Sequence, residues 1–221
     1  RENLLLDQII EENRQKRTAM LHALQAQINP HFLYNALDMV SWHALSKGED
    51  SIADIVSSIS NLMHYSISRP DSTASLSREI ENIREFIRIY QMERPCDIQL
   101  IPDFSPEQAD QIPIPKFTLQ PLVENSILHG FEGWKEGGHI RICGEGYREL
   151  LRITIEDNGC GMNQGQRDLI REVLRNPGSE KKCDMGIGIR NVIMRMKMYY
   201  GEDFQAELWT EEGKGTRFIF T

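Results

Sequence analysis

A histidine lies beside a proline in a stretch of residues 25–35 that otherwise has the apolar spacing of a helix. The imidazole of His31 can act as a nucleophile, because an unperturbed pKa of about 6.5 leaves most of it neutral at pH 7. Pro30 indicates either a kink inside the helix or, with Asn29 as N-cap, the start of a helix. A single histidine on a helix is more often a packed or solvated side chain than a nucleophile.

Two glycine-rich stretches occur in the second half of the chain, DNGCGM at 157–162 and GIGIRN at 186–191. Glycines permit positive φ and close approach of a ligand, and a helix N-terminus offers N–H groups to a phosphate. Asp157, at the end of an expected strand, either starts a turn or accepts a hydrogen bond from an exocyclic amine. Each stretch alone could merely shape a turn, but together they suggest a nucleotide pocket.

Asn125 and His129 are four residues apart in an expected helix over 117–129, so both project from one face, with Glu124 beside them. An asparagine oxygen suits Mg²⁺, which keeps most of its waters and takes other ligands from phosphates. The alternative is a surface asparagine and a histidine that complements the C-terminal end of the helix dipole.

Apolar spacing predicts one long helix over 1–45 and a second helix over about 50–68. The charged stretch within the first helix is interpreted as part of a coiled coil that arrives from an upstream module. Two such helices cannot bury both apolar faces alone, so we expect a second copy of the hairpin and a dimeric four-helix bundle. A proline-containing break then places the domain boundary between segments 1–72 and 73–221.

The second segment mixes helices and strands, which favours helices packed on one face of a largely antiparallel sheet. The expected elements are a helix capped by Ser77 that ends before Pro95, a strand over 98–104, the helix over 117–129, a hairpin of 138–143 with 150–156, a helix over 191–200, and a strand pair of 205–210 with 216–221.

The composition limits the classes of protein to which this chain can belong. The chain has 221 residues with 40% hydrophobic and 26% charged residues, which is ordinary for a globular protein. Its net charge of -8 argues against non-specific binding to nucleic acid, which needs clustered Lys and Arg. The four cysteines lack metal-ligand spacing and are interpreted as free thiols in a reducing compartment. The chain begins at Arg1 with a helical pattern already running, so we expect a cytoplasmic portion of a longer protein.

These stretches resemble two sets of family motifs. Residues 28–35 look like the phosphoacceptor box of the LytS/YesM-like sensor histidine kinases, and the later stretches resemble the ATP-binding boxes of the GHKL superfamily. The resemblance extends from about residue 19 to 221. It implies a dimeric α-helical hairpin that bears the phosphorylated histidine, followed by an α+β sandwich ATP-binding domain of the Bergerat type. The matching ATP-binding positions are Asn125 with His129, Asp157 with Gly159 and Gly161, Gly186 with Gly188, and Gly215 with Thr216.

The resemblance also implies a role for each of these residues. Asn125 would bind Mg²⁺ with ATP, Asp157 the adenine amino group, and His129 a phosphate. Thr216 would line the adenine end. The polar stretch 162–185 is interpreted as a lid over the phosphates that is disordered unless ATP is bound. The glycines that would flank this lid are Gly159, Gly161, Gly186 and Gly188.

The implied reaction moves the γ-phosphoryl group of ATP to His31 and then to an aspartate of a separate response regulator. In the commonest histidine kinases an acidic residue follows the phosphoacceptor and takes its proton, whereas here Phe32 follows. Asn35, one turn on, can orient the ring or a water, and Glu124 is a candidate general base. The resemblance further implies a homodimer, located at the cytoplasmic face of a bacterial cell membrane and joined to an upstream membrane-spanning sensor module.

Two rival functions remain open. GHKL ATPases of the chaperone or repair kind hydrolyse ATP with a glutamate on the helix before the metal-binding asparagine. Here Pro121 stands one turn before Asn125 and Glu124 is adjacent, which favours phosphotransfer. The second rival is a catalytically silent dimerisation and signalling module, against which the intact glycine boxes count.

Overall fold

The computed structural model describes residues 30–67, 73–94, 96–147, 150–177 and 187–221. The chain divides into two compact units, Arg1–Ser60 and Asn61–Thr221. This division falls within a helix that continues past Ser60, whereas the boundary expected from the sequence lies further on, after residue 72.

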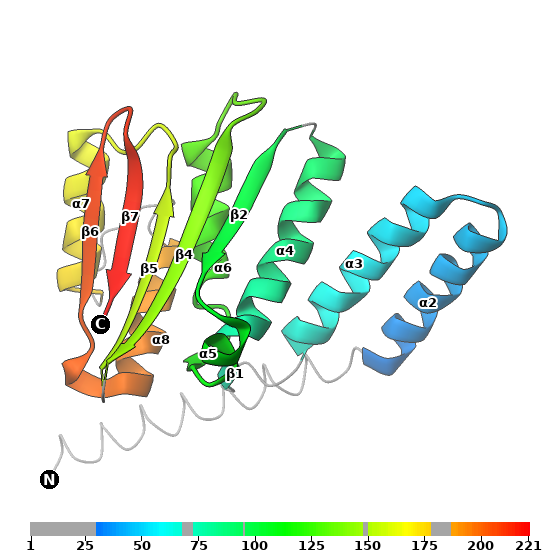
Figure 1. Cartoon of the computed structure of the whole chain (residues 1–221), viewed down its shortest axis with the longest axis horizontal. Coiled ribbons are helices and arrows are strands. Elements are labelled where there is room, and N and C mark those ends of the chain that lie inside the picture. Colours follow the sequence, from blue (N-terminus) through cyan, green and yellow to red (C-terminus); the bar gives the residue numbers. More distant parts are fainter. Residues whose placement is uncertain (1–29, 68–72, 95, 148–149, 178–186) are drawn as a thin grey trace, which may run out of the picture. The chain divides into compact units, whose positions relative to one another are not determined.

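The first unit contains a helical hairpin (Figure 1). Helix α2 spans Pro30–Ser46 and helix α3 spans Asp50–Ile67, which confirms the predicted turn and second helix. Gly48 in the turn has a φ of 75°, which glycine adopts readily. The hydroxyls of Ser41 and Ser57 lie 3.4 Å apart and link the two helices. The part of the expected helix over 1–45 that precedes Pro30 lies outside the described residues, so the expected kink at Pro30 stays a prediction.

The second unit is built on a five-stranded sheet with the order β2-β4-β5-β7-β6 (Figure 1). Neighbouring strands are antiparallel except for β2 and β4, which are parallel, so the predicted largely antiparallel sheet is confirmed. A separate two-stranded sheet pairs β1 with β3 and was not expected from the sequence. The strands are β1 Thr73–Ser75, β2 Ile98–Asp103, β3 Pro113–Pro115, β4 Gly138–Tyr147, β5 Leu150–Asp157, β6 Ala206–Glu211 and β7 Gly215–Phe220.

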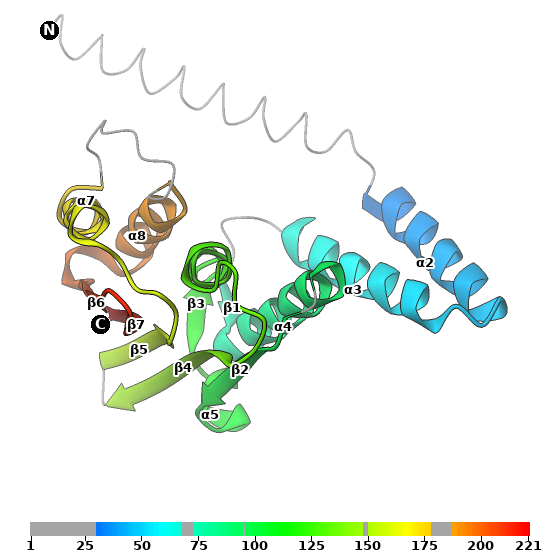
Figure 2. The same cartoon turned by 90° about the horizontal axis from the view of Figure 1, so that it is seen from above.

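Helices α4, α6, α7 and α8 cover one face of this sheet (Figure 2). Alternate strand residues such as Ile140, Ile142 and Ile153 point to that face and are buried, as expected for a sheet with one covered face. The helical elements of this unit are α4 Leu76–Glu93, α5 Pro106–Asp110, α6 Gln120–Asn125, the π turn η1 Ser126–Gly130, α7 Gln164–Arg175, α8 Ile187–Tyr200 and the 3₁₀ turn η3 Gly201–Asp203.

Several element boundaries differ from the expectation. Ser75, rather than Ser77, caps α4, because its hydroxyl accepts from the backbone N–H of Arg78.

Cys96, Cys143 and Cys160 are free cysteines, and Cys183 lies outside the described residues. No helix in the described ranges is long and apolar enough to cross a bilayer.

Candidate functional site

Asp157 ends strand β5 and is the centre of the candidate site. Its side chain is 6% exposed and accepts three hydrogen bonds. The backbone N–H groups of Gly159 and Thr216 donate to Oδ1 over 2.9 and 3.2 Å, and the Ser126 hydroxyl donates to Oδ2 over 2.6 Å. Strand pairing explains part of this arrangement, because Asp157 and Thr216 are register partners in the β5–β7 ladder.

Burial raises the pKa of the Asp157 carboxyl, and the hydrogen bonds from Ser126, Gly159 and Thr216 oppose that shift. An ionised carboxylate offers about four lone-pair positions. Three positions are used by these donors, so one more donor, such as an exocyclic amine, can bind the same group.

The glycines around Asp157 allow three loops to approach one another closely. The backbone N–H of Cys160 donates to the Gly130 carbonyl over 2.8 Å, and a Cβ on Gly159 would lie 2.6 Å from that oxygen. Gly161 has a φ of 67°, and its Cβ would lie 2.1 Å from the carbonyl oxygen of Glu211. A side chain at either glycine therefore requires the backbone to move.

The segment that carries Asn125 is shorter and less regular than predicted. Helix α6 begins at Gln120 instead of 117 and ends at Asn125, and a π turn then runs to Gly130. The Phe131 N–H donates to the Ser126 carbonyl over 2.9 Å, which is the five-residue spacing of a π turn. Such turns are frequent at functional sites. The predicted helix over 117–129 is therefore wrong at its start and takes the form of a π turn in its second half, whereas its end agrees with the prediction.

The polar residues on this segment differ in their surroundings. Asn125 is half-buried, whereas His129 is exposed. Glu124 accepts a hydrogen bond from the side-chain amide of Gln120 over 2.7 Å, which fixes the direction of its carboxylate. The backbone carbonyl of His129 accepts from the Cys160 thiol over 3.2 Å, so this segment is joined to the loop after β5.

Helix α8 begins next to α6. A Cβ on Gly188 would lie 3.4 Å from the Cβ of Pro121, so the start of α8 packs closely on the first turn of α6. Gly186 lies outside the described residues. Gly188 therefore lies against the helix that carries Asn125, and both residues belong to the second unit.

The stretch interpreted as a lid contains a regular helix. Residues 164–175 form α7, with a reciprocal capping box between Asn163 and Gln166. Within this helix, the side chains of Ile170 and Val173 are buried. The prediction that this stretch is disordered is wrong for α7, because a cap and two apolar side chains stabilise it. Residues 178–186 lie outside the described ranges.

His31 and Asn35 lie on α2, in the first unit, with His31 in the first turn. Their placement on a helix was predicted. The other predicted site residues that the structure describes lie in the second unit.

Sequence reasoning missed three residues of the site. Ser126 donates to Asp157, and Gly130 supplies the carbonyl that receives the loop after β5. The Thr210 hydroxyl accepts from the Met162 N–H over 3.0 Å and lies 3.1 Å from the carbonyl oxygen of Gly215. Ser126 directly follows Asn125 and Gly130 ends the same segment, so proximity to the motif was the available signal.

The side chains present fit a metal that arrives with a nucleotide. Within the described ranges, no group of three or more His, Cys, Asp or Glu side chains could hold a metal ion. Mg²⁺ bound to phosphates keeps several waters and needs only one or two protein ligands. Asn125 is half-buried, and its side-chain amide oxygen is suited to that role.

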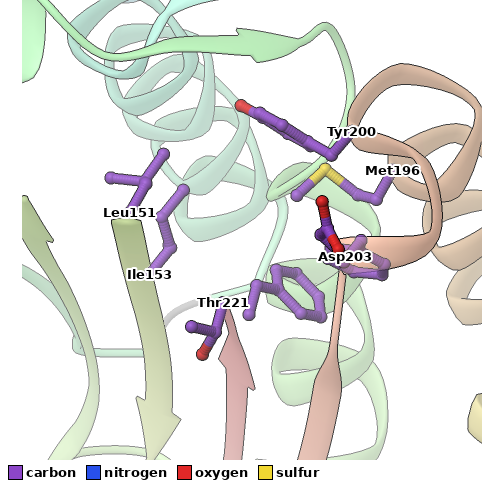
Figure 3. Close-up of a pocket in the computed structure, with 8 residues that line it drawn as sticks. Leu151, Ile153, Met196, Tyr200, Asp203 and Thr221 are labelled. Carbon is purple, nitrogen blue, oxygen red and sulfur yellow. The ribbon is translucent and has the colours of Figure 1, made fainter. Parts of the chain in front are cut away.

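A mostly apolar cavity of about 220 Å³ lies at the other end of strand β5 (Figure 3). Leu151 and Ile153 line it from the strand and Met196 and Tyr200 from α8. Residue 151 is roughly 20 Å along the strand from Asp157, at about 3.3 Å per residue. The hydroxyl of Tyr200 donates to the Pro113 carbonyl over 2.7 Å, and burial raises the pKa of Tyr200 to about 12. This cavity is separate from the site around Asp157.

Two family models match the chain. One, described as histidine kinase, matches residues 19–96. The other, described as histidine kinase-, DNA gyrase B-, and HSP90-like ATPase, matches residues 110–221 and includes the residues around Asp157.

Two curated relatives match most of the chain. Sensor histidine kinase YesM of Bacillus subtilis is 32% identical over 220 residues, which is 98% of this chain and 36% of that protein. Sensor histidine kinase YpdA of Escherichia coli is 32% identical over 185 residues, 83% of this chain and 31% of that protein. The chain thus spans about a third of the length of these relatives.

A solved structure of similar length is the histidine kinase domain from the blue-light activated histidine kinase of Erythrobacter litoralis EL346. The two chains are 14% identical, and their superposition covers 95% of this chain and 93% of the solved one, with a TM-score of 0.46.

Proposed function

Because the chain belongs to the histidine kinase-, DNA gyrase B-, and HSP90-like ATPase family, we propose that it is the kinase portion of a sensor histidine kinase of the LytS/YesM-like type. It transfers the γ-phosphoryl group of ATP to His31 and then to an aspartate of a response regulator. The observation that carries this proposal is the buried carboxylate of Asp157, held by three donors where glycine loops converge.

The adenine of ATP is bound at Asp157. Its exocyclic amine donates to the remaining lone-pair position of the carboxylate, and Thr216, 7% exposed, lines the same end. The phosphates extend toward Asn125 and His129. The four glycines of the predicted boxes, Gly159, Gly161, Gly186 and Gly188, flank the lid over them.

The amide oxygen of Asn125 would hold the Mg²⁺ that accompanies ATP. When bound, this ion would neutralise charge on the phosphate oxygens. The residues of this chain position the donor and the acceptor, which is the larger part of catalysis in phosphoryl transfer.

In the transfer step, an imidazole nitrogen of His31 forms a bond to the γ-phosphorus while the bond from that phosphorus to the β–γ bridging oxygen breaks and ADP leaves. The other imidazole nitrogen then loses its proton to a base. Glu124 is our candidate for the base, and its hydrogen bond with Gln120 supports a fixed orientation of the carboxylate. Asn35, one turn after His31, orients the ring.

The active form is a homodimer. On α2, Trp42 is 72% exposed and Met39 is 67% exposed, and a second copy of the hairpin would bury such side chains. The chain spans about a third of the length of its relatives, and in the whole protein we place a sensor module upstream of it. We place that module in the bacterial cell membrane and the present chain at its cytoplasmic face, where the receiver domain of a response regulator can dock.

The proposal is tested by incubating the chain with Mg²⁺ and ATP labelled at the γ-phosphate. Wild type should acquire an acid-labile label, and His31→Gln should acquire none. His43→Gln, which changes an exposed histidine on the same helix, is the matched control and should be labelled like wild type. Asn125→Asp should also abolish the label. Label that persists in His31→Gln would refute the phosphoacceptor assignment.

A further inference from the structure

Glu79, in the first turn of α4, is a carboxyl group with 0% of its surface exposed. Its Oε1 accepts from the Tyr65 hydroxyl and from the Phe117 N–H over 2.7 Å. Its Oε2 accepts from the N–H groups of Thr118 and Leu119 over 3.0 and 3.1 Å. Four donors therefore fill the acceptor positions of one buried carboxylate. Burying a charged group is costly unless it is paired in this way, so its partners identify what it holds in place.

The three backbone donors directly precede α6, the helix that ends at Asn125. Among the described residues, Phe117 is the one non-glycine residue with a positive φ, at 58°. Such a conformation persists only where the surrounding contacts impose it, and the bond from its N–H to Glu79 is one of them. The apolar side chain of Leu119, at the N-cap position, cannot cap the helix itself. Glu79 thus fixes the backbone from which α6 starts.

Tyr65 connects this carboxylate to the end of α3. The tyrosine is 4% exposed, and its ring packs edge-on against the ring of Phe117 with centroids 5.1 Å apart. The Nζ of Lys116 lies 5.1 Å from the centre of the Tyr65 ring. Both the hydroxyl and the ring of Tyr65 therefore contact the segment that Glu79 holds.

Helix α8 also contacts this segment. The guanidinium of Arg195 donates to the carbonyl of Lys116, and the Thr118 hydroxyl donates to the Pro115 carbonyl over 2.6 Å. Thr118 is completely buried. The segment 115–119, which directly precedes α6, thus contacts the end of α3 and the helices α4 and α8.

We propose that Glu79 is a positioning residue for the nucleotide site: it holds the backbone at 117–119, and through α6 it sets the place of Asn125, while Tyr65 makes that place depend on the end of α3. This inference rests on the proposed function, because Asn125 is the proposed ligand of Mg²⁺. Helices α4 and α6 lie side by side on the same face of the sheet, as the inference requires (Figures 1 and 2).

The test compares Glu79→Gln with wild type in the full 221-residue chain. Glutamine keeps the size but replaces one acceptor oxygen with a donor that opposes the backbone N–H groups. Without nucleotide, hydrogen exchange at the amides of Phe117, Thr118 and Leu119 should accelerate by about tenfold or more. The affinity for ATP with Mg²⁺ should fall by about tenfold, while the affinity for ATP with EDTA should change by less than about twofold.

Two further variants sharpen the result. Tyr65→Phe keeps the ring and removes one donor in four, so it should shift both readings in the same direction by a smaller factor. Glu81→Gln makes the identical change on the exposed side of α4, where the carboxylate pairs with Arg78, and should behave like wild type.

The outcomes separate this inference from the proposed function. If Glu79→Gln weakens binding of ATP equally with and without Mg²⁺, or leaves amide exchange unchanged, the positioning role is refuted. If Glu79→Gln does not fold, Tyr65→Phe provides the test. The positioning role is then refuted if Tyr65→Phe has the same amide exchange rates and the same affinity for ATP with Mg²⁺ as wild type. A wild-type chain that binds no nucleotide would overturn the proposed function and this inference with it.

Discussion

The carbonyl oxygen of Gly130 accepts a hydrogen bond from the amide of Cys160 at 2.8 Å. This contact joins the end of the π turn η1 to the loop that follows strand β5. A helical segment bearing Asn125 and a strand bearing Asp157 thereby meet at one point, although they are far apart in the sequence. The approach is possible because Gly159, which lies between Asp157 and Cys160, has no side chain.

Gly159→Ala should disrupt this approach. Its Cβ would lie 2.6 Å from the Gly130 carbonyl oxygen, so the backbone must shift and the free energy of unfolding should fall by about 1–3 kcal/mol. Nucleotide affinity should fall with it, as measured by chemical denaturation and by nucleotide titration. Gly165→Ala is the control, because its Cβ would lie 3.5 Å from the nearest atom, Oδ1 of Asn163, which is an ordinary contact distance. Helix propensity predicts a gain of up to about 1 kcal/mol for this variant. Equal stabilities of Gly159→Ala and wild type would contradict the steric account.

Asp157→Asn should change how stability depends on pH. Burial raises the pKa of the Asp157 carboxyl in the folded chain above the unfolded value of about 3.9. Between these two values the folded state binds more protons than the unfolded state, so this group's contribution to stability is lost as pH rises through the raised pKa. Asparagine does not titrate. Without nucleotide, the melting temperature of Asp157→Asn relative to wild type should therefore increase from about pH 4 to about pH 8.

The same variant should bind ATP more weakly, because it loses the carboxylate that receives the adenine amine. Glu156→Gln removes the neighbouring carboxylate, which pairs with Arg217 at 2.6 Å near the surface, and controls for the loss of a charge on this strand. The pH prediction for Asp157→Asn would be contradicted if the difference in melting temperature between this variant and wild type were the same at every pH.

Much of the second unit could be predicted because its sheet has one buried face. Alternating apolar residues in β5, such as Ile153 and Ile155, report that face directly. The parallel pairing of Ile98 with Gly138 has no local signal, since it joins strands from distant parts of the chain. The short β1–β3 pair also escapes prediction, because Pro113 and Pro115 at the ends of β3 are unfavourable in strands.

The site was predictable where residue type carries the chemistry, as for Asp157 and its glycines. Ser126 could not be assigned from its residue type, because its position next to Asn125 was the one signal and its contact with Asp157 is made only in the fold. Glu79 could not be assigned either, because a glutamate in a helical first turn is normally exposed. Helix α7 had a signal in its sequence, the cap formed by Asn163 and Gln166, but the polar composition of the stretch outweighed it.

Asn163→Ala should destabilise α7. The Asn163 side chain accepts from the Gln166 N–H over 3.0 Å, and loss of an N-cap typically costs about 1 kcal/mol. Chemical denaturation measures this change, and hydrogen exchange should show faster opening of residues 164–175 than of the sheet. Gln164→Ala, an exposed change one residue later, should leave both readings near wild type. If the two variants lose equal stability, the cap does not hold the helix.

Thr210→Val should loosen the junction between the loop after β5 and the β6–β7 turn. The Thr210 hydroxyl accepts from the Met162 N–H and lies within hydrogen-bonding distance of the Gly215 carbonyl, and both would lose this partner. The side chain is 5% exposed, so the free energy of unfolding should fall by about 1–3 kcal/mol. Thr210→Ser keeps the hydroxyl and should recover most of the loss in chemical denaturation. Because Met162 leads into α7, its amide should also exchange faster in Thr210→Val, and a serine variant as unstable as the valine variant would show that the methyl group, not the hydrogen bonds, stabilises the junction.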